Sequence, residues 1–133
     1  MKVNLNRFIG RQQLRLLHQL CKKEDAAHFS ALLKRLEETI ATMPQTHGTE
    51  GQGDQAIAYL HYFSGGSDWW ITERDCEEEQ LQAFGFACLN GWRDSAEFGY
   101  VSISELIAGN VEIDCYWTPT SIAEIKKRMA VAA

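Results

Sequence analysis

Three side chains of this chain have the chemistry of an acid/base site: His61, Thr72 and Glu73. They lie within YLHYFSGGSDWWITERD, residues 59–75, on either side of a Gly-Gly pair. If the two halves form a hairpin, His61 can act as a general base beside Glu73, with Thr72 orienting both. A core histidine that is hydrogen-bonded to a carboxylate or to the backbone explains the same position, and we favour it over catalysis. These residues define a small enzyme as the second hypothesis for function.

The carboxylates that follow Glu73 would suit a divalent metal, since Mg²⁺ and Mn²⁺ prefer oxygen ligands. A metal-dependent nuclease also needs cations to hold phosphate, yet Arg74 and Arg93 are the only cations in residues 36–125. A solvated acidic face is therefore the favoured interpretation of these carboxylates. The four histidines show no shared ligand spacing, so the sequence predicts no metal site and no cofactor.

The cysteines and the chain termini bear on the compartment. The cysteines are far apart and form no C-x-x-C pair: Cys21, Cys76, Cys88 and Cys115. This spacing favours four reduced thiols in a cytosolic protein over disulfides or a zinc site. The N-terminal sequence lacks the apolar run of a signal peptide, and no segment approaches the roughly 18 apolar residues of a membrane span. We therefore expect a cytoplasmic protein that does not bind a membrane.

Charge is divided unevenly along the chain. Residues 1–43 carry a net charge of +4 and residues 44–133 a net charge of −9, within a total of −5. The acidic surface expected for residues 44–133 attracts basic macromolecules and repels polynucleotides. Exposed tryptophans on such a surface can anchor a protein partner. The candidate binding residues are Trp69, Trp70, Glu73, Asp75, Glu77, Glu78, Asp94 and Glu97.

The spacing of apolar residues changes along the chain, and it predicts the helices and strands that must position these residues. In residues 1–44, apolar positions recur at helical spacing in RQQLRLLHQLCKK and DAAHFSALLKRLEETIATMP, which predicts a helical hairpin ended by Pro44. Residues 45–55 are polar and glycine-rich, typical of a flexible connector. From Ala56 the period becomes two, with a tight turn at the Gly65–Gly66 pair.

The expected fold class is therefore α+β, in a single domain of residues 1–133. An N-terminal helical hairpin, residues 1–44, packs on an antiparallel sheet of four to five strands formed by residues 56–133. A central strand is expected over AIAYLHYF and an edge strand over VEIDCYW. A short helix begins at Ser102 and a C-terminal helix at Pro119, each with a capping-box serine, Ser102 or Ser121.

The order of motifs resembles a known family. YLHYFSGGSDWWITERD, AFGFACLN, AEFGYVSISEL and VEIDCYWTP follow one another as in the uncharacterised bacterial family known as domain of unknown function 2958. The resemblance covers residues 56–125, about half of the chain, and the doubled tryptophan and the helical N-terminal third depart from the core pattern. The matching positions are Trp69 or Trp70, Thr72, Glu73, Asp75, Phe84, Gly85, Glu97, Gly99, Tyr100, Ser102, Glu105 and Leu106.

This resemblance implies occurrence on bacterial plasmids, phages and integrated elements, and no established reaction. The leading hypothesis is a non-enzymatic accessory protein of such a mobile element, which binds a protein partner with a basic surface through its own acidic surface. An anti-defence inhibitor of restriction or CRISPR machinery is one version. A third hypothesis is direct nucleic-acid binding by the basic helices, which the acidic remainder disfavours. Edge strands and amphipathic helices are also compatible with a homodimer.

Overall fold

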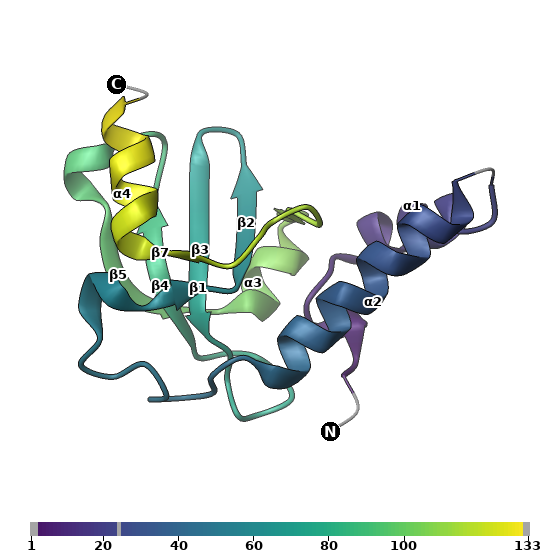
Figure 1. Cartoon of the computed structure of the whole chain (residues 1–133), viewed down its shortest axis with the longest axis horizontal. Coiled ribbons are helices and arrows are strands. Elements are labelled where there is room, and N and C mark those ends of the chain that lie inside the picture. Colours follow the sequence, from purple (N-terminus) through teal and green to yellow (C-terminus); the bar gives the residue numbers. More distant parts are fainter. Residues whose placement is uncertain (1–2, 24, 132–133) are drawn as a thin grey trace.

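The fold is α+β, as the sequence predicts. We describe it from a computed structural model, which covers residues 3–23 and 25–131. A five-stranded antiparallel sheet has the order β5-β4-β3-β2-β6, and β1 pairs with β7 in a second sheet of two strands. The N-terminal helices extend to one side of the sheet, and the C-terminal helix α4 (Ile122–Val131) lies across one of its faces (Figure 1).

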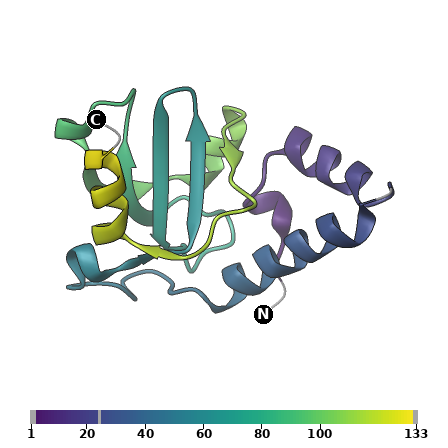
Figure 2. The same ribbon diagram turned by 45° about the horizontal axis from the view of Figure 1, so that its top comes forward.

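The predicted helical hairpin is confirmed in the described residues. A short turn η1 (Leu5–Arg7) leads into α1 (Arg11–Leu20), which packs against α2 (Ala26–Thr42). The buried side chains of α2 follow the predicted stripe, at Leu32, Leu33, Leu36 and Ile40. The outer ends of both helices reach well beyond the sheet, as Figure 2 shows, so much of their polar surface faces solvent.

The central hairpin joins β2 (Leu60–Ser64) to β3 (Ser67–Glu73). Gly65 has a φ of 56°, which is the left-handed conformation that a tight hairpin turn requires. The register places His61 opposite Trp70, so these two side chains lie on the same face of the sheet. β4 (Ala83–Cys88) and β5 (Glu97–Val101) continue the sheet beyond β3, and β6 (Glu112–Ile113) forms the other edge beside β2.

The structure corrects the bounds of one predicted strand and the start of one predicted helix. The expected central strand AIAYLHYF is divided into β1 (Ile57–Ala58) and β2, because the first part pairs with β7 (Thr120–Ser121). The C-terminal helix accordingly begins at Ile122 rather than Pro119. Its predicted serine cap is present, since the Glu124 backbone N–H donates to Ser121 Oγ at 3.1 Å.

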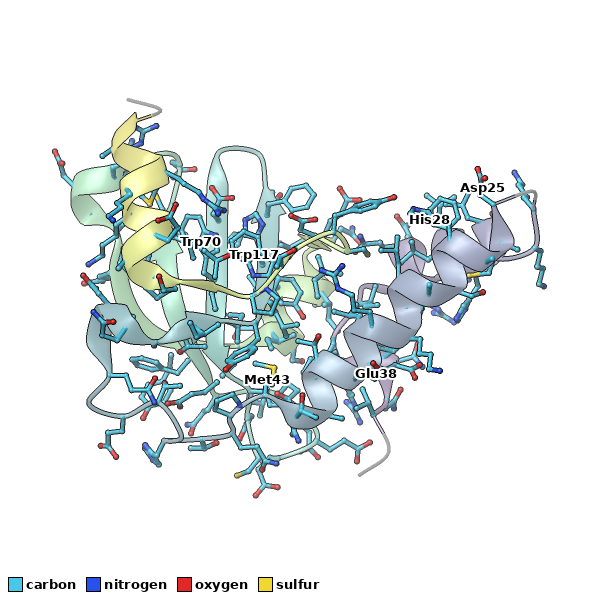
Figure 3. The ribbon with its side chains drawn as sticks, viewed as in Figure 1. Asp25, His28, Glu38, Met43, Trp70 and Trp117 are labelled. Carbon is cyan, nitrogen blue, oxygen red and sulfur yellow. The ribbon has the colours of Figure 1, made fainter. Side chains whose placement is uncertain are left out.

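The sheet carries a core on each face. One core joins Leu60, Tyr62 and Ile71 to the N-terminal helices and to α3 (Ile103–Ala108). On the opposite face, Trp70 and Phe86 pack against the apolar side of α4. Trp70 and Trp117 lie side by side between α4 and the strands in Figure 3, and Met43 marks the end of α2 nearest the sheet. Within the described residues, no helix combines the length and hydropathy needed to cross a bilayer.

Candidate functional site

Two pockets open on the α4 side of the sheet, and each contains one of the predicted acid/base residues. The Glu73 pocket is bounded by residues 47–56 of the connector and by β3, β4 and β5, with Thr72 and Glu73 in its lining. The His61 pocket lies at the opposite end of α4, and Trp70, Trp117 and Met129 contribute to its walls. His61 and Glu73 therefore belong to different sites, and the predicted acid/base pair does not form.

Glu73 anchors the connector to the sheet. Its side chain is 5% exposed, and Oε1 accepts a hydrogen bond from the His47 backbone N–H at 2.8 Å. Oε2 accepts from the Thr49 backbone N–H at 2.8 Å and from Thr49 Oγ1 at 2.5 Å. The residues that the sequence identifies as a flexible connector are thus fastened to β3, because a buried carboxylate needs donors and residues 47–49 supply them.

The neighbours of Glu73 in the ITERD segment are buried as well. Thr72 Oγ1 donates to the Phe84 carbonyl oxygen at 3.2 Å, across the β3–β4 ladder. The Arg74 side chain is 2% exposed, and its Nε donates to the Ile40 carbonyl oxygen near the end of α2 at 2.8 Å. Burial lowers the pKa of the Arg74 guanidinium. This segment therefore links three parts of the fold: the end of α2, the connector and the sheet.

Asp75 organises the turn that follows β3. Its Oδ1 accepts from the Glu77 backbone N–H at 3.1 Å, and its Oδ2 accepts from the Gln82 backbone N–H at 3.0 Å. Burial acts to raise the pKa of the Asp75 carboxyl, but hydrogen bonds from these amides, from Thr46 and from Cys76 lower the pKa overall. The ionised form is therefore the one that the turn stabilises.

His61 is held on both sides by carboxylates. Its Nε2 lies 2.8 Å from Asp68 Oδ1, and its Nδ1 lies 3.4 Å from Asp114 Oδ2. The ring is parallel to the Trp70 indole, with centroids 5.5 Å apart and an interplanar angle of 8°. Because neither ring nitrogen is free to take a substrate proton, this geometry matches the structural alternative, a histidine bonded to carboxylates, rather than a general base.

The cysteines offer no alternative nucleophile near these pockets. Cys88 lines the His61 pocket, but burial and the nearby Asp68 raise the pKa of its thiol. Burial, together with Asp114 and Glu112, raises the pKa of Cys115 to about 11. Since the thiolate is the reactive form, both residues are poor nucleophiles at neutral pH. In residues 3–23 and 25–131, no three His, Cys, Asp or Glu side chains form a group that could hold a metal ion.

The predicted binding residues do not form one surface. Trp70, Glu73 and Asp75 are buried, so their side chains do not form part of the outer surface of the sheet. Trp69 is half-buried and packs against the core on the face opposite α4. The exposed members fall into two groups at opposite ends of β4: Glu77 and Glu78 precede the strand, and Asp94 and Glu97 follow it.

Several residues that line the two pockets or contact His61 have no recognisable signal in the sequence. Thr49 stands in a polar connector, and its contact with Glu73 spans 24 positions. Asp114 reaches His61 across 53 positions. Phe98 and Tyr100 of β5 could have been placed beside Phe84 and Phe86 only if the β4–β5 register had been known, because alternation alone defines faces and not partners.

No protein-family model, no curated protein and no solved structure matches this chain. The family resemblance of residues 56–125 therefore stays a prediction, and the function rests on the geometry of the sites and the distribution of charge.

Proposed function

We propose that the protein is non-enzymatic and binds a partner protein that has a basic surface. This proposal rests on a contrast between two sets of polar residues. The candidate acid/base residues already form internal hydrogen bonds, whereas many carboxylates of the sheet part are exposed. Between Glu50 and Asp114 the sequence has thirteen acids and two arginines. An excess of one sign on a surface accelerates association with a partner of the opposite sign and selects against the wrong partners.

The best-organised part of this surface is an acidic end formed by Glu50, Glu77, Glu78 and Glu79. All four are exposed, and none of them forms an ion pair within the described parts of the chain. The connector and the turn after β3 that carry them lie at the same end of the sheet in Figure 1. The buried carboxylates of Glu73 and Asp75 hold these two loops in place. The binding role that we assign to Glu73 and Asp75 is therefore the positioning of exposed acids.

The biological setting of the proposal rests on the resemblance of residues 56–125 to the mobile-element family. An accessory protein from a plasmid or phage can act by occluding a basic, nucleic-acid-binding surface of host machinery, and an anti-defence inhibitor is one specific form of this function. An acidic end on a rigid scaffold has the charge that such occlusion needs. A cytoplasmic partner and location belong to the same proposal.

The first test compares the wild-type protein with the triple variant Glu77→Gln, Glu78→Gln and Glu79→Gln in pull-downs from bacterial lysate, with mass spectrometry. We expect the wild type to retain a basic protein whose capture falls as salt rises from about 0.1 to 0.5 M, because screening shortens the range of surface charge. The triple variant should lose most of this protein. The matched control, Glu37→Gln with Glu38→Gln on the exposed side of α2, should retain it. If the same protein is captured equally at every salt concentration and by the triple variant, charge-driven binding is ruled out.

A specific observation favours one second candidate function, nucleic-acid binding by α1. Residues 3–23 contain no acid, and Arg11, Arg15, His18 and Lys22 are exposed at spacings that place them along one side of the helix. They line a shallow depression with Asn6 and Gln19. Phosphates are held by such unpaired cations, with a strong dependence of affinity on salt.

This candidate predicts a gel shift with duplex DNA or single-stranded RNA. The shift should disappear when the five basic residues of this arm are changed to glutamine: Arg7, Arg11, Arg15, Lys22 and Lys23. It should survive the triple glutamine variant of the acidic end. A wild-type protein that shows no shift at about 50 mM salt, where phosphate contacts are strongest, would eliminate this function.

A further inference from the structure

The Glu73 pocket is a concave, partly apolar site that no internal contact explains. Its volume is about 260 Å³, and it lies beside the acidic end, with Glu50 in its lining. Sites for drug-sized ligands and cofactors occupy roughly 300–1,000 Å³. A pocket below this range suits a single side chain or a small ion better than a cofactor.

Three aromatic rings form one wall of the pocket: Phe84, Phe98 and Tyr100. Phe84 is nearly parallel to Phe98, with an interplanar angle of 10°, and meets Tyr100 edge to face with centroids 5.5 Å apart. Tyr100 is 62% exposed, so its ring is accessible to a ligand at the pocket. The faces of such rings carry partial negative charge and attract cations.

A cation of the protein itself already uses this aromatic surface. Lys126 Nζ lies 5.1 Å from the centroid of Phe86 and 5.7 Å from that of Phe98. The same Nζ donates to Asp54 Oδ1 at 2.8 Å. Beside the pocket, therefore, a cation is held between aromatic rings and a carboxylate of the connector. The pocket itself is also lined by aromatic rings and carboxylates.

The charge of the pocket is negative. Glu50 lies at its exposed rim and the buried Glu73 lines its inner part, while none of the described lining residues is a lysine or an arginine. Glu73 Oε1 accepts one hydrogen bond, from the His47 N–H, and a carboxylate oxygen can accept two. An entering donor could therefore be bound without displacing an existing hydrogen bond of Glu73.

The other pocket on the α4 side of the sheet specifies no ligand of its own. The His61 pocket contains Asp68 together with Arg93 and Arg128, so its rim carries both signs of charge. Its histidine is occupied by two carboxylates. The Glu73 pocket has aromatic rings and carboxylates, with no lysine or arginine in its described lining, and this combination favours a cation.

We propose that the Glu73 pocket receives an arginine side chain of the partner protein. This inference rests on the proposed function, because it names the side chain of the basic partner that binds beside the acidic end. A guanidinium is planar, stacks on aromatic rings and donates several hydrogen bonds in a fixed fork, so it can contact Tyr100, Glu50 and Glu73 at once. An ammonium ion is more strongly hydrated and matches this combination less well.

The test uses the whole chain and defined peptides. A blocked Gly-Arg-Gly peptide, titrated to about 10 mM, should shift the backbone amide signals of Thr49, Tyr100 and their neighbours in a saturable way in NMR spectra. The same peptide with citrulline, which keeps the shape and removes the charge, should bind at least about fivefold more weakly. Equal binding of the two peptides, or shifts confined to other parts of the chain, would overturn the inference.

Variants separate the pocket from the general negative charge. Tyr100→Ala and Glu50→Gln should each weaken the arginine peptide about fivefold, as expected for the loss of one exposed cation–π or ionic contact. The matched controls Trp92→Ala and Glu112→Gln remove an equally exposed ring and acid outside the pocket, and should bind as the wild type does. If the variants and the controls lose affinity for the peptide equally, the peptide does not bind specifically in the pocket, and the inference fails.

Two further arms identify the source of the cation and keep this inference distinct from the proposed function. Agmatine, a free guanidinium compound, should bind more weakly than the peptide, because it lacks the flanking backbone; tighter binding would indicate a small-cation site and overturn the choice of a protein side chain. If the arginine peptide does not bind but the lysate partner is still captured through Glu77–Glu79, this inference fails and the proposed function stands. If the peptide binds as predicted and no partner is captured, the pocket stands and the proposed function fails.

Discussion

Replacing Gly85 by alanine should destabilise the protein by about 3 kcal/mol or more, a large share of the 5–15 kcal/mol that stabilises a typical domain. A Cβ atom at position 85 would lie 2.1 Å from the Trp70 carbonyl oxygen and 3.0 Å from the Ile71 Cα. Both are backbone atoms of the adjacent strand, so no side-chain rotation can relieve the clash. Urea denaturation followed by circular dichroism would measure the loss as a lower midpoint.

Gly99 provides a matched control for this prediction. It is the register partner of Gly85 on β5, and a Cβ built there meets nothing within 4 Å. Gly99→Ala should therefore change the free energy of unfolding by no more than about 0.5 kcal/mol. Similar losses at both positions would show that the loss at Gly85 does not come from a clash with the backbone of β3.

The close contact at Gly85 lies next to an irregularity in β3. The β3–β4 register shifts between Ile71 and Glu73, which leaves Thr72 as an extra residue on β3. The small residues of AFGFA suggest a slot for a tryptophan ring, but at position 85 the close neighbour is the backbone of β3. The same bulge lies next to Glu73, the carboxylate that anchors the connector.

Replacing Glu73 by alanine should cost about 3 kcal/mol or more, because it leaves the His47 N–H, the Thr49 N–H and the Thr49 hydroxyl without their acceptor. A buried donor that loses its partner costs about 1–3 kcal/mol, and here three are affected together. We expect a lower midpoint in urea and faster proteolytic cleavage within residues 45–55.

The exposed Glu77 is the control for this second prediction. Glu77→Ala removes an acid from the neighbouring turn without removing an internal acceptor, and should leave the free energy of unfolding within about 0.5 kcal/mol of the wild type. A Glu73→Ala protein that is as stable as the Glu77→Ala protein would contradict the anchoring role. It would also return Glu73 to the list of candidate catalytic residues.

The enzyme hypothesis arises from polar residues that share one hairpin. Histidine, threonine and glutamate on the two arms of one hairpin have the right chemistry, and the hairpin itself is present. However, His61 pairs with Trp70 in the middle of β3, whereas Glu73 is the last residue of β3 and lies beyond Ile71, the last β3 residue that pairs with β2. The two side chains consequently line separate pockets.

The sequence by itself determined the elements whose energetics are local. The apolar stripe of α2, the left-handed glycine at the β2–β3 turn and the caps at Ser102 and Ser121 each depend on residues within a few positions of one another. Alternating polar and apolar residues likewise predict an antiparallel sheet, because the strands of a parallel sheet are usually buried on both faces and form continuous apolar runs.

Only the tertiary structure decided which charged residues are exposed. Glu73, Arg74 and Asp75 look like a solvated polar segment in the sequence, but all three are buried. Burying a charge is costly unless hydrogen bonds replace water, and the groups that replace it here include Ile40 and Thr49, which are 34 and 24 positions away from their partners. Local propensity carries no information about such distant partners, so the burial of this segment, and with it the shape of the acidic end, could come only from the fold.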